Sequence, residues 1–293
     1  MRCTLLGTGT SHGIPVIGCS CGTCTSCDPK DKRTRTSALF ECCSAQGNAA
    51  FVIDTGPEFR IQALTYGITR LDAVFITHDH ADHLHGIDDL RVFSCCKPGT
   101  AQPHTGLPLY SNAQVLESIR TRFPYIFKDI KTGGGRPQLQ LCSIEGKPAA
   151  VGPMTVRAVP LVHGNARTTG CLVSHTAPDG SLHSIAYLTD CKTIPESSYE
   201  LLARYGGSID HLVIDALRVR PHGTHLSFEE ALLCAARIGA VHTWLFHICH
   251  DMRHAQIMQY VSDICQKKPE LRALTENGRT AAPAYDGLQL ETC

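Results

Sequence analysis

The sequence lacks an excess of charge of either sign and any long hydrophobic run. Its 293 residues include 27 lysines and arginines and 27 aspartates and glutamates, so the formal net charge is zero. A protein that grips the phosphate backbone of nucleic acid normally carries a basic surface. Nucleic acid is therefore not the expected partner.

No apolar run reaches the roughly 20 residues that a membrane-spanning helix needs. The opening residues, MRCTLLGTGT, also lack the apolar core and the cleavage site of a signal peptide. The sequence therefore predicts a cytoplasmic protein with no membrane partner.

Cysteine, by contrast, is abundant, with 16 residues in the chain. Without a secretory signal, clustered cysteines are more often metal ligands than disulfides. The stretch GCSCGTCTSC, residues 18–27, brings Cys19, Cys21, Cys24 and Cys27 into one short segment. This loop is predicted to bind zinc, because thiolates are soft ligands that favour it over hard ions.

Short apolar runs typical of strands alternate with helical patterns along the whole chain, and no internal repeat is visible. The strands are expected at 3–7, 50–56, 73–80, 107–111, 154–162, 184–190, 211–217 and 241–248. The helices are expected at 57–67, 85–93, 112–123, 195–206, 227–239 and 253–268. This alternation predicts a layered α/β fold, and we treat 1–293 as a single domain.

Residues 97–150 fit this alternation least and are interpreted as an insertion. Glycine- and proline-rich stretches flank a helix that carries Phe123, Tyr125 and Phe127. Two interpretations remain open: a solvated loop with a packed helix, or a lid that shapes a substrate pocket.

The sequence THDHADH, residues 77–83, follows the apolar run DAVFI and contains His78, His80, Asp82 and His83. Several histidines packed together repel one another when protonated, unless a metal holds them neutral. In an extended His-x-His segment both imidazoles lie on one side, while the following Asp and His can turn toward a second metal. The spacing therefore indicates a dinuclear metal site.

The HDHADH stretch resembles the His-x-His-x-Asp-His signature of the metallo-β-lactamase superfamily. The resemblance implies a four-layer αββα sandwich, and it extends to His163 in LVHGN, Asp190 in YLTDCK and His247 in LFHICH. By the same resemblance, His78, His80 and His163 hold one metal. Asp82, His83 and His247 hold the other, and Asp190 bridges the two.

Two divalent ions about 3.5 to 4 Å apart can share a water molecule, lower its pKa and clamp the oxygens of the reacting group. Asp190 suits the bridging position, because a carboxylate can give one oxygen to each ion. Nitrogen and carboxylate ligands admit manganese, zinc or iron. Asp54, in VIDTG, is either a partner that holds a ligand imidazole or a plain turn residue.

The stretch RPHGTHLSFEEALLCAARIGAVHTWLFHICH, residues 220–250, resembles the phosphodiesterase branches of the superfamily. The resemblance makes His225 the general acid for the leaving oxygen, and Arg167 a candidate for stabilising negative charge. A structural role is also open for this segment. LSFEE reads as a capping box, with Ser227 as the N-cap and Glu230 three residues later.

The stretch GTGTSHGIPVIGCSCGTC resembles the cyclic-phosphate phosphodiesterases of the bacterial carbon-phosphorus lyase pathway. That resemblance implies a structural zinc held by Cys19, Cys21, Cys24 and His250, with Cys27 left over. An all-thiolate site, in which Cys27 replaces His250, is the alternative.

These features together predict a phosphodiesterase in which a metal-bridging hydroxide attacks phosphorus, with small or cyclic phosphodiesters, including cyclic nucleotides, as substrates. The alternatives are an RNA 3′-end processing nuclease of the ribonuclease Z type and a non-catalytic zinc-binding scaffold. The resemblance also allows a homodimer.

Overall fold

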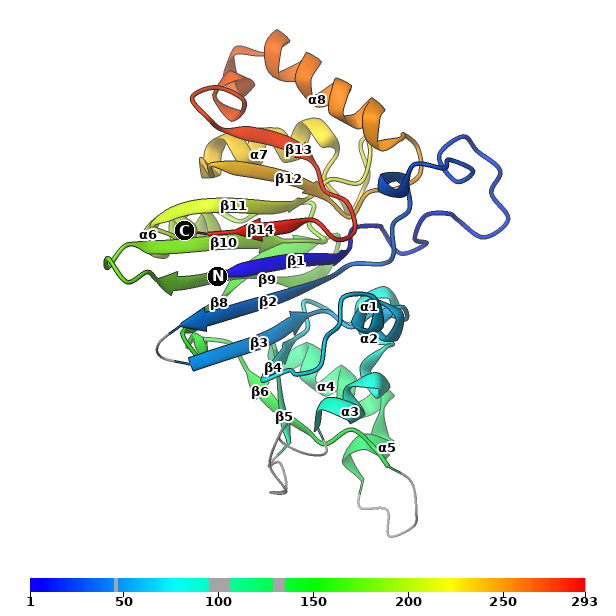
Figure 1. Ribbon diagram of the computed structural model, residues 1–293, viewed down its shortest axis with the longest axis vertical. Coiled ribbons are helices and arrows are strands. Elements are labelled where there is room, and N and C mark those ends of the chain that lie inside the picture. Colours follow the sequence, from blue (N-terminus) through cyan, green and yellow to red (C-terminus); the bar gives the residue numbers. More distant parts are fainter. Residues whose placement is uncertain (45–46, 95–105, 129–134, 293) are drawn as a thin grey trace.

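The apolar runs of the sequence form two packed β-sheets with helices on both outer faces (Figure 1). The structure is a computed structural model that describes residues 1–44, 47–94, 106–128 and 135–292. Among these residues, no helix combines the length and the apolar character that a membrane crossing requires.

The first sheet has the spatial order β14-β1-β2-β3-β4-β5-β6. Its antiparallel half runs from β14 to β3, and its parallel half from β3 to β6. The strands are β1 (Arg2–Gly7), β2 (Ser37–Ser44), β3 (Gly47–Ile53), β4 (Ala73–Phe75), β5 (Leu107–Ser111), β6 (Leu139–Ser143) and β14 (Gln289–Glu291).

The second sheet has the spatial order β13-β12-β11-β10-β9-β8-β7. Strands β10 to β13 pair parallel, and β7 to β10 pair antiparallel. The strands are β7 (Ala149–Val151), β8 (Met154–His163), β9 (Ala166–Thr176), β10 (Leu182–Leu188), β11 (Ser208–Asp215), β12 (His242–Phe246) and β13 (Thr280–Pro283).

The helices form the two outer layers. Over the first sheet lie α1 (Phe59–Thr65), α2 (Ala81–Leu84), η2 (Ile87–Leu90), α3 (Arg91–Ser94), α4 (Ala113–Arg122) and α5 (Pro124–Phe127). Over the second lie α6 (Glu196–Tyr205), α7 (Phe228–Ile238), α8 (His254–Lys267) and η3 (Pro269–Leu274). A short turn, η1 (Pro29–Asp31), follows the cysteine-rich loop.

Three apolar clusters hold these four layers together. Successive side chains of a strand point to opposite faces of its sheet. In β10, Ile185 and Tyr187 accordingly point into the core between the two sheets, while Ala186 and Leu188 pack under the helices of the second sheet. A third cluster lies between the first sheet and its helices. The predicted αββα sandwich is confirmed.

The segment interpreted as an insertion contributes ordered elements to the first sheet. Within 97–150 the structure describes β5, α4, α5, β6 and part of β7. Residues 95–105 and 129–134, which include most of the glycine- and proline-rich stretches, lie outside the described residues.

Local sequence signals explain how the helix nearest the site begins and ends. The Ser227 side chain accepts a hydrogen bond from the Glu230 backbone, and the Glu230 side chain accepts one from the Ser227 backbone. Gly239, with φ of 77°, ends α7 in the left-handed conformation that glycine tolerates. The predicted capping box is confirmed.

Candidate metal centre

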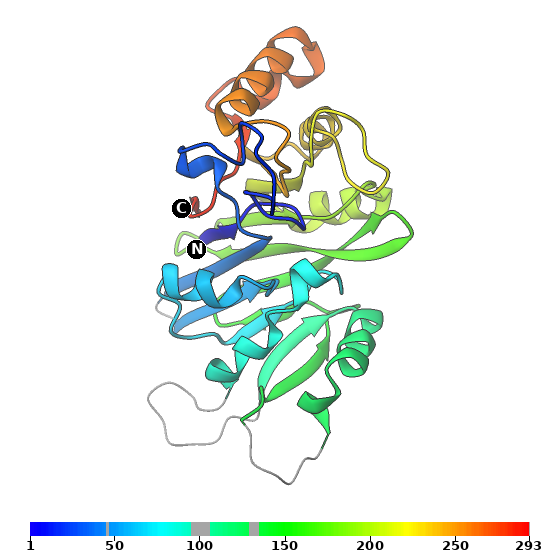
Figure 2. The same cartoon turned by 90° about the vertical axis from the view of Figure 1, so that its right-hand side faces the viewer.

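Four candidate ligands lie where strands end, at one end of the sandwich. His78 follows β4, His163 ends β8, Asp190 follows β10 and His247 follows β12. Ligand sites of α/β proteins commonly form at the carboxyl ends of strands, where neighbouring loops meet. All four residues are buried. This end of the molecule lies on the right of Figure 1 and faces the viewer in Figure 2.

His78, His80 and His163 form the first triad. One ring nitrogen of each lies within 4.8 Å of the others. Burial and the nearby His83 hold the pKa of His78 well below its ordinary value, and burial also lowers the pKa of His163. Neutral imidazoles are the form that binds a metal ion.

Asp82, His83 and His247 form the second triad, with one ligand atom each within the same 4.8 Å limit. Asp190 lies between the triads. Its Oδ2 is 3.2 Å from His83 Nε2 and 3.3 Å from His247 Nδ1, and its Oδ1 is 3.9 Å from His78 Nε2. One carboxylate thus faces ligands of both groups, as a bridging ligand must.

The buried carboxylates of this centre carry negative charge that a cation would balance. Burial alone would raise the pKa of Asp190, but the imidazoles of His247 and His83 hold it well below its ordinary value. Burial likewise opposes a charge on His83, yet the carboxylates of Asp190, Asp54 and Asp82 raise its pKa well above normal. Ionised carboxylates this deeply buried need positive charge beside them.

Further residues orient the imidazoles. Asp54 accepts hydrogen bonds from His83 Nδ1 at 2.7 Å and from the Thr77 backbone at 2.8 Å. His163 Nδ1 donates to the Thr224 carbonyl at 2.8 Å. Each bond turns the other ring nitrogen of its histidine toward the cluster. Of the two interpretations of Asp54, the geometry matches the partner of a ligand imidazole.

Backbone strain is concentrated at the same place. Four non-glycine residues of the described chain have positive φ, and three of them are Asp54 at 63°, Asp190 at 53° and His247 at 59°. Such conformations are sparsely populated for residues with a Cβ and often occur at functional sites. Asp54 and His247 follow a strand directly, Asp190 stands two residues after one, and all three turn their side chains toward the cluster.

The residues present fit a pair of divalent ions. The Nε2 atoms of His78 and His83 are buried without a hydrogen-bond partner in the described structure. Leaving such atoms unpaired is costly unless a ligand takes the lone pair. Nitrogen and carboxylate donors without sulfur suit manganese, zinc or iron.

His225, which sequence analysis assigned to acid catalysis, lies beside the first triad. Its ring centroid is 4.6 Å from that of His163. Its Nδ1 lies 2.9 Å from Asp215 Oδ2, and this oxygen also accepts from the Cys191 backbone at 2.8 Å. Burial opposes protonation of His225, but the hydrogen bond to Asp215 raises its pKa above the ordinary value.

Asp215 was missed by the sequence analysis. It ends β11 and is fully buried. The run HLVID carries the same signal as the others, an apolar strand that ends in an acid, and could have identified it. Arg167, the candidate for charge stabilisation, is exposed at the start of β9, and the described structure shows no contact between its guanidinium and either triad.

Helix α4 holds the loop that carries His78 and His80. Asp79 lies between these two histidines. Its carboxylate accepts a hydrogen bond from Ser118 Oγ at 2.6 Å and forms an ion pair with Arg122 at 3.2 Å. Arg122 also donates to the Asp79 carbonyl. The segment interpreted as an insertion thus braces the metal-ligand loop.

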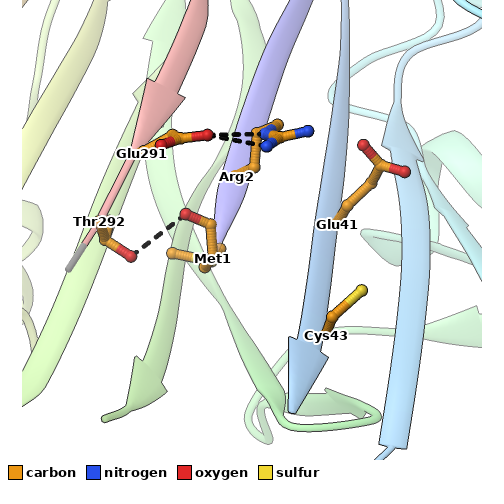
Figure 3. Close-up of a pocket in the computed structure, with 6 residues that line it drawn as sticks. All are labelled: Met1, Arg2, Glu41, Cys43, Glu291 and Thr292. Atoms are coloured by element: carbon orange, nitrogen blue, oxygen red, sulfur yellow. Dashed lines mark hydrogen bonds and ion pairs between the residues drawn. The ribbon is translucent and has the colours of Figure 1, made fainter.

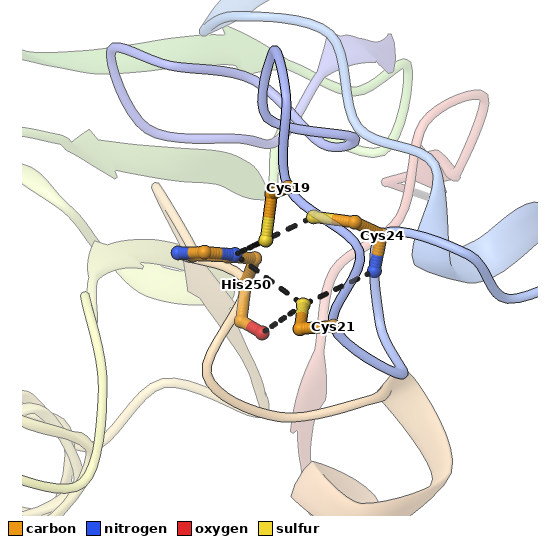
Figure 4. Close-up of side chains that lie close together, drawn as sticks. All are labelled: Cys19, Cys21, Cys24 and His250. Carbon is orange, nitrogen blue, oxygen red and sulfur yellow. Dashed lines mark hydrogen bonds between the residues drawn. The ribbon is translucent and has the colours of Figure 1, made fainter.

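The cysteine cluster forms a second, separate group. Cys19, Cys21 and Cys24 place their Sγ atoms 3.4, 3.5 and 3.4 Å from His250 Nδ1 (Figure 4). A tetrahedral zinc with the usual bond lengths, about 2.3 Å to sulfur and 2.1 Å to nitrogen, separates such atoms by roughly 3.5 Å. The four residues present therefore fit one zinc ion.

Cys27 is exposed and lies outside this group. Within the group, the Cys24 backbone N–H lowers the pKa of the Cys21 thiol to about 6. A thiol with a lowered pKa readily gives the thiolate that binds zinc.

A pocket of about 320 Å³ lies at the opposite end of β1, away from both clusters (Figure 3). It is lined by Met1, Arg2, Glu41, Cys43, Glu291 and Thr292. Two of its charged groups, Arg2 and Glu291, already pair with each other. The candidate ligands contribute nothing to its wall, so the chemistry is not expected there.

Comparison with known proteins connects this arrangement to other chains. The beta-lactamase superfamily domain matches residues 50–248. A crystal structure of a diphosphatase from the PhnP family is 33% identical, with a TM-score of 0.78, covering 99% of this chain and 97% of that one. The short form of human tRNase Z shares the fold, at 16% identity and a TM-score of 0.60, over 99% of both chains.

A curated relative, named octanoyltransferase, comes from Porphyromonas gingivalis. It is 38% identical over 261 residues, which are 88% of this chain and 47% of the relative. The chain thus spans about half the length of the curated relative it matches.

Proposed function

This chain belongs to the beta-lactamase superfamily, and on that premise we propose that it is a dinuclear metal-dependent hydrolase of small phosphodiesters, cyclic ones included. The arrangement that carries the proposal is Asp190, with ligand groups on both sides, next to the His225–Asp215 pair. Such a centre combines a place for two ions with an oriented proton donor.

In this proposal, His78, His80 and His163 hold one ion, Asp82, His83 and His247 hold the other, and Asp190 contacts both. Two ions held in this way polarise the phosphoryl oxygens and lower the pKa of water. The protein's own residues orient the substrate, exclude bulk water and move one proton.

His225 is the residue that moves this proton. Asp215 holds its Nδ1, so the proton available to the substrate is on Nε2, on the side of His163 and Asp190. A leaving oxygen that takes this proton departs as a neutral hydroxyl instead of an alkoxide. Asp215 fixes the tautomer and the ring orientation, as an acid beside a catalytic histidine does.

Cys19, Cys21, Cys24 and His250 hold a structural zinc in the same proposal. This zinc would tie the N-terminal loop to the segment after β12, three residues beyond His247. It leaves no open position for a substrate, because three sulfurs and one nitrogen complete a tetrahedron.

Diphosphate hydrolysis is a second candidate. It is favoured by the similarity to the PhnP-family diphosphatase, at 33% identity over nearly the whole of both chains. The similarity to tRNase Z is a similarity of fold, and a net charge of zero supplies no overall positive charge to attract RNA. The octanoyltransferase name belongs to a chain of which about half has no counterpart here.

The test is a metal count followed by assays with added manganese. The substrates are bis-p-nitrophenyl phosphate, a 2′,3′-cyclic nucleotide, a diphosphate-linked dinucleotide, precursor tRNA and an octanoyl thioester. Hydrolysis of any of the first three supports a small-phosphoester enzyme. Turnover of only the tRNA or only the thioester contradicts the proposal and identifies the other activity.

Asp190→Ala provides the decisive variant. Loss of the shared carboxylate should lower turnover at least about 10³-fold and reduce the metal content of the histidine cluster. Asp179→Ala, in an exposed turn, is the matched control and should leave both unchanged. Full turnover in Asp190→Ala would show the dinuclear mechanism to be wrong.

A further inference from the structure

The loop between β11 and α7 places a second histidine beside His225. The ring centroids of His222 and His225 are 5.4 Å apart. His222 is part-buried, and it belongs to neither triad. The proposed mechanism leaves this residue without a role.

The orientation of His222 is fixed by its own loop. Its Nδ1 lies 3.3 Å from the Thr224 backbone nitrogen, which donates to it, and 3.2 Å from Thr224 Oγ1. An imidazole that accepts at Nδ1 carries its proton on Nε2. The Thr224 carbonyl also accepts a hydrogen bond from His163. Thr224 therefore orients the rings of both His222 and the candidate metal ligand His163.

The base of this loop is rigid. Leu217 N donates to the Leu226 carbonyl at 2.9 Å, and Phe228 N donates to the Arg218 carbonyl at 2.9 Å. Arg218 and Ser227 form an isolated bridge between the two sides. The loop therefore presents its side chains from a fixed frame and pays little ordering entropy when a ligand binds.

Positive charge surrounds the loop without a full complement of acids. Arg218 Nε is buried and has no hydrogen-bond partner in the described structure. Lys192 reaches Glu230 at 2.6 Å. Burial lowers the pKa of His222, and the charges of His225, Arg218 and Lys192 lower it further. Lys192 is paired with Glu230, so Arg218, at the base of the loop, is the cation available to a ligand.

We propose that His222 and Arg218 form a subsite for an anionic group on the leaving side of the substrate, so that the favoured leaving group is itself a phosphate monoester. This inference rests on the proposed function, because His225 defines the leaving side as the side that receives its proton. A cyclic nucleotide opens to a hydroxyl without such a charge, whereas a diphosphate releases a phosphate that fits the subsite.

The reaction then balances as a hydrolysis. The oxygen of water bonds to one phosphorus, and the bond from that phosphorus to the bridging oxygen breaks. The electron pair stays on the bridging oxygen, which accepts a proton from His225. Water's proton passes to solvent, from which His225 recovers its own, and two phosphate monoesters leave.

The test compares two substrates across matched variants. For His222→Ala and Arg218→Gln, kcat/KM for a diphosphate-linked dinucleotide should fall about tenfold or more, because a hydrogen bond to a charged group is lost. The value for bis-p-nitrophenyl phosphate should stay within about twofold. Arg220→Gln, an exposed neighbour paired with Asp251, is the control and should change neither.

Binding gives a readout that does not depend on turnover. AMP, a phosphate monoester, should bind the wild type with its metals in place, and its Kd should rise about tenfold in His222→Ala, with His222→Gln closer to the wild type because the amide still donates. Thermal midpoints equal to that of the wild type establish that the variants are folded; if His222→Ala is not, His222→Phe, which keeps a ring but cannot donate, and Arg218→Gln take its place.

Equal losses on both substrates, or no loss on either, overturn the subsite, as does unchanged AMP binding. A failure of the proposed function would give a different result from a failure of the subsite. In that case the wild type, with its metals bound, turns over neither phosphorus substrate, and the subsite is then judged by AMP binding alone.

Discussion

The cysteine cluster and the histidine–aspartate cluster are both suited to metal ions, but they differ in how completely their donors would surround an ion. The two clusters are close in sequence, because His247 and His250 are three residues apart. The cysteine cluster takes four donors from two loops, and those four fill a tetrahedron. In the proposed function, the histidine–aspartate cluster would take its donors from several strand ends and from α2, and its two ions would keep positions open for water or substrate.

The two clusters also differ in the groups that hydrogen-bond to their ligand side chains. In the histidine–aspartate cluster, ligand imidazoles are oriented by other groups, such as Asp54 and the Thr224 carbonyl. In the cysteine cluster, the Sγ atoms of Cys24 and Cys21 accept hydrogen bonds from the backbone N–H groups of Val16 and Cys24, and the thiols also contact His250. The difference matches the proposed roles, in which one cluster would stabilise a loop and the other would position reacting groups.

The largest expected effect is on stability, through the cysteine cluster. Cys19→Ser and His250→Ala should each remove one zinc per chain and lower the free energy of unfolding by more than about 2 kcal/mol, because metal binding contributes directly to folding. Metal analysis and urea unfolding measure the two effects.

Cys27→Ser is the control, since Cys27 is exposed and outside the cluster; it should cost less than about 0.5 kcal/mol. If Cys27→Ser removes the zinc and His250→Ala does not, the all-thiolate interpretation is correct and the contrast between the clusters must be redrawn.

An intermediate effect is expected at Asp54. Asp54→Asn weakens the acceptor for His83 Nδ1, and metal affinity of the histidine–aspartate cluster should fall about 10- to 100-fold. Competition with a chelator measures it, and the zinc of the cysteine cluster should remain. Asp72→Asn, whose carboxylate pairs with Arg70 at the far end of β4, should leave affinity unchanged. Equal loss from both clusters would mean general unfolding.

The smallest effect is expected at the brace from α4. Arg122→Gln removes the ion pair to Asp79, and because this pair is partly exposed, metal affinity should fall only about two- to fivefold. Arg120→Gln on the same helix, whose partner is Glu117, is the control. Metal affinity is measured by titration with the metal ion. If Arg122→Gln and Arg120→Gln have the same metal affinity, the ion pair from α4 does not help to hold the ligand loop.

Much of the architecture was predictable from local patterns. Short apolar runs predicted eight of the fourteen described strands, and β2, β6, β7, β9, β13 and β14 were not expected. LSFEE predicted the start of α7, because a capping box is satisfied within four residues. The candidate ligands were predictable because His163, Asp190 and His247 stand at strand ends, and HDHADH concentrates the other four in six residues.

The residues that contact these ligands and His225 were harder to predict from the sequence. Asp215 ends its strand like the others, but only its 2.9 Å contact with His225 distinguishes it from an ordinary strand-end acid. The link from α4 to Asp79 joins residues about 40 positions apart, and the segment that carries α4 looked like an insertion. Nothing in the spacing of either pair indicates that they meet.

The sequence by itself determined which donor atoms this protein has and that several of them stand at strand ends, since both depend on neighbouring residues. Only the tertiary structure decided which donors share a centre, because packing two sheets brings β4, β8, β10 and β12 to one end. It also decided that His250, rather than Cys27, lies against Cys19, Cys21 and Cys24. Distances between residues far apart in the chain are set by the packing of whole layers, which no local pattern encodes.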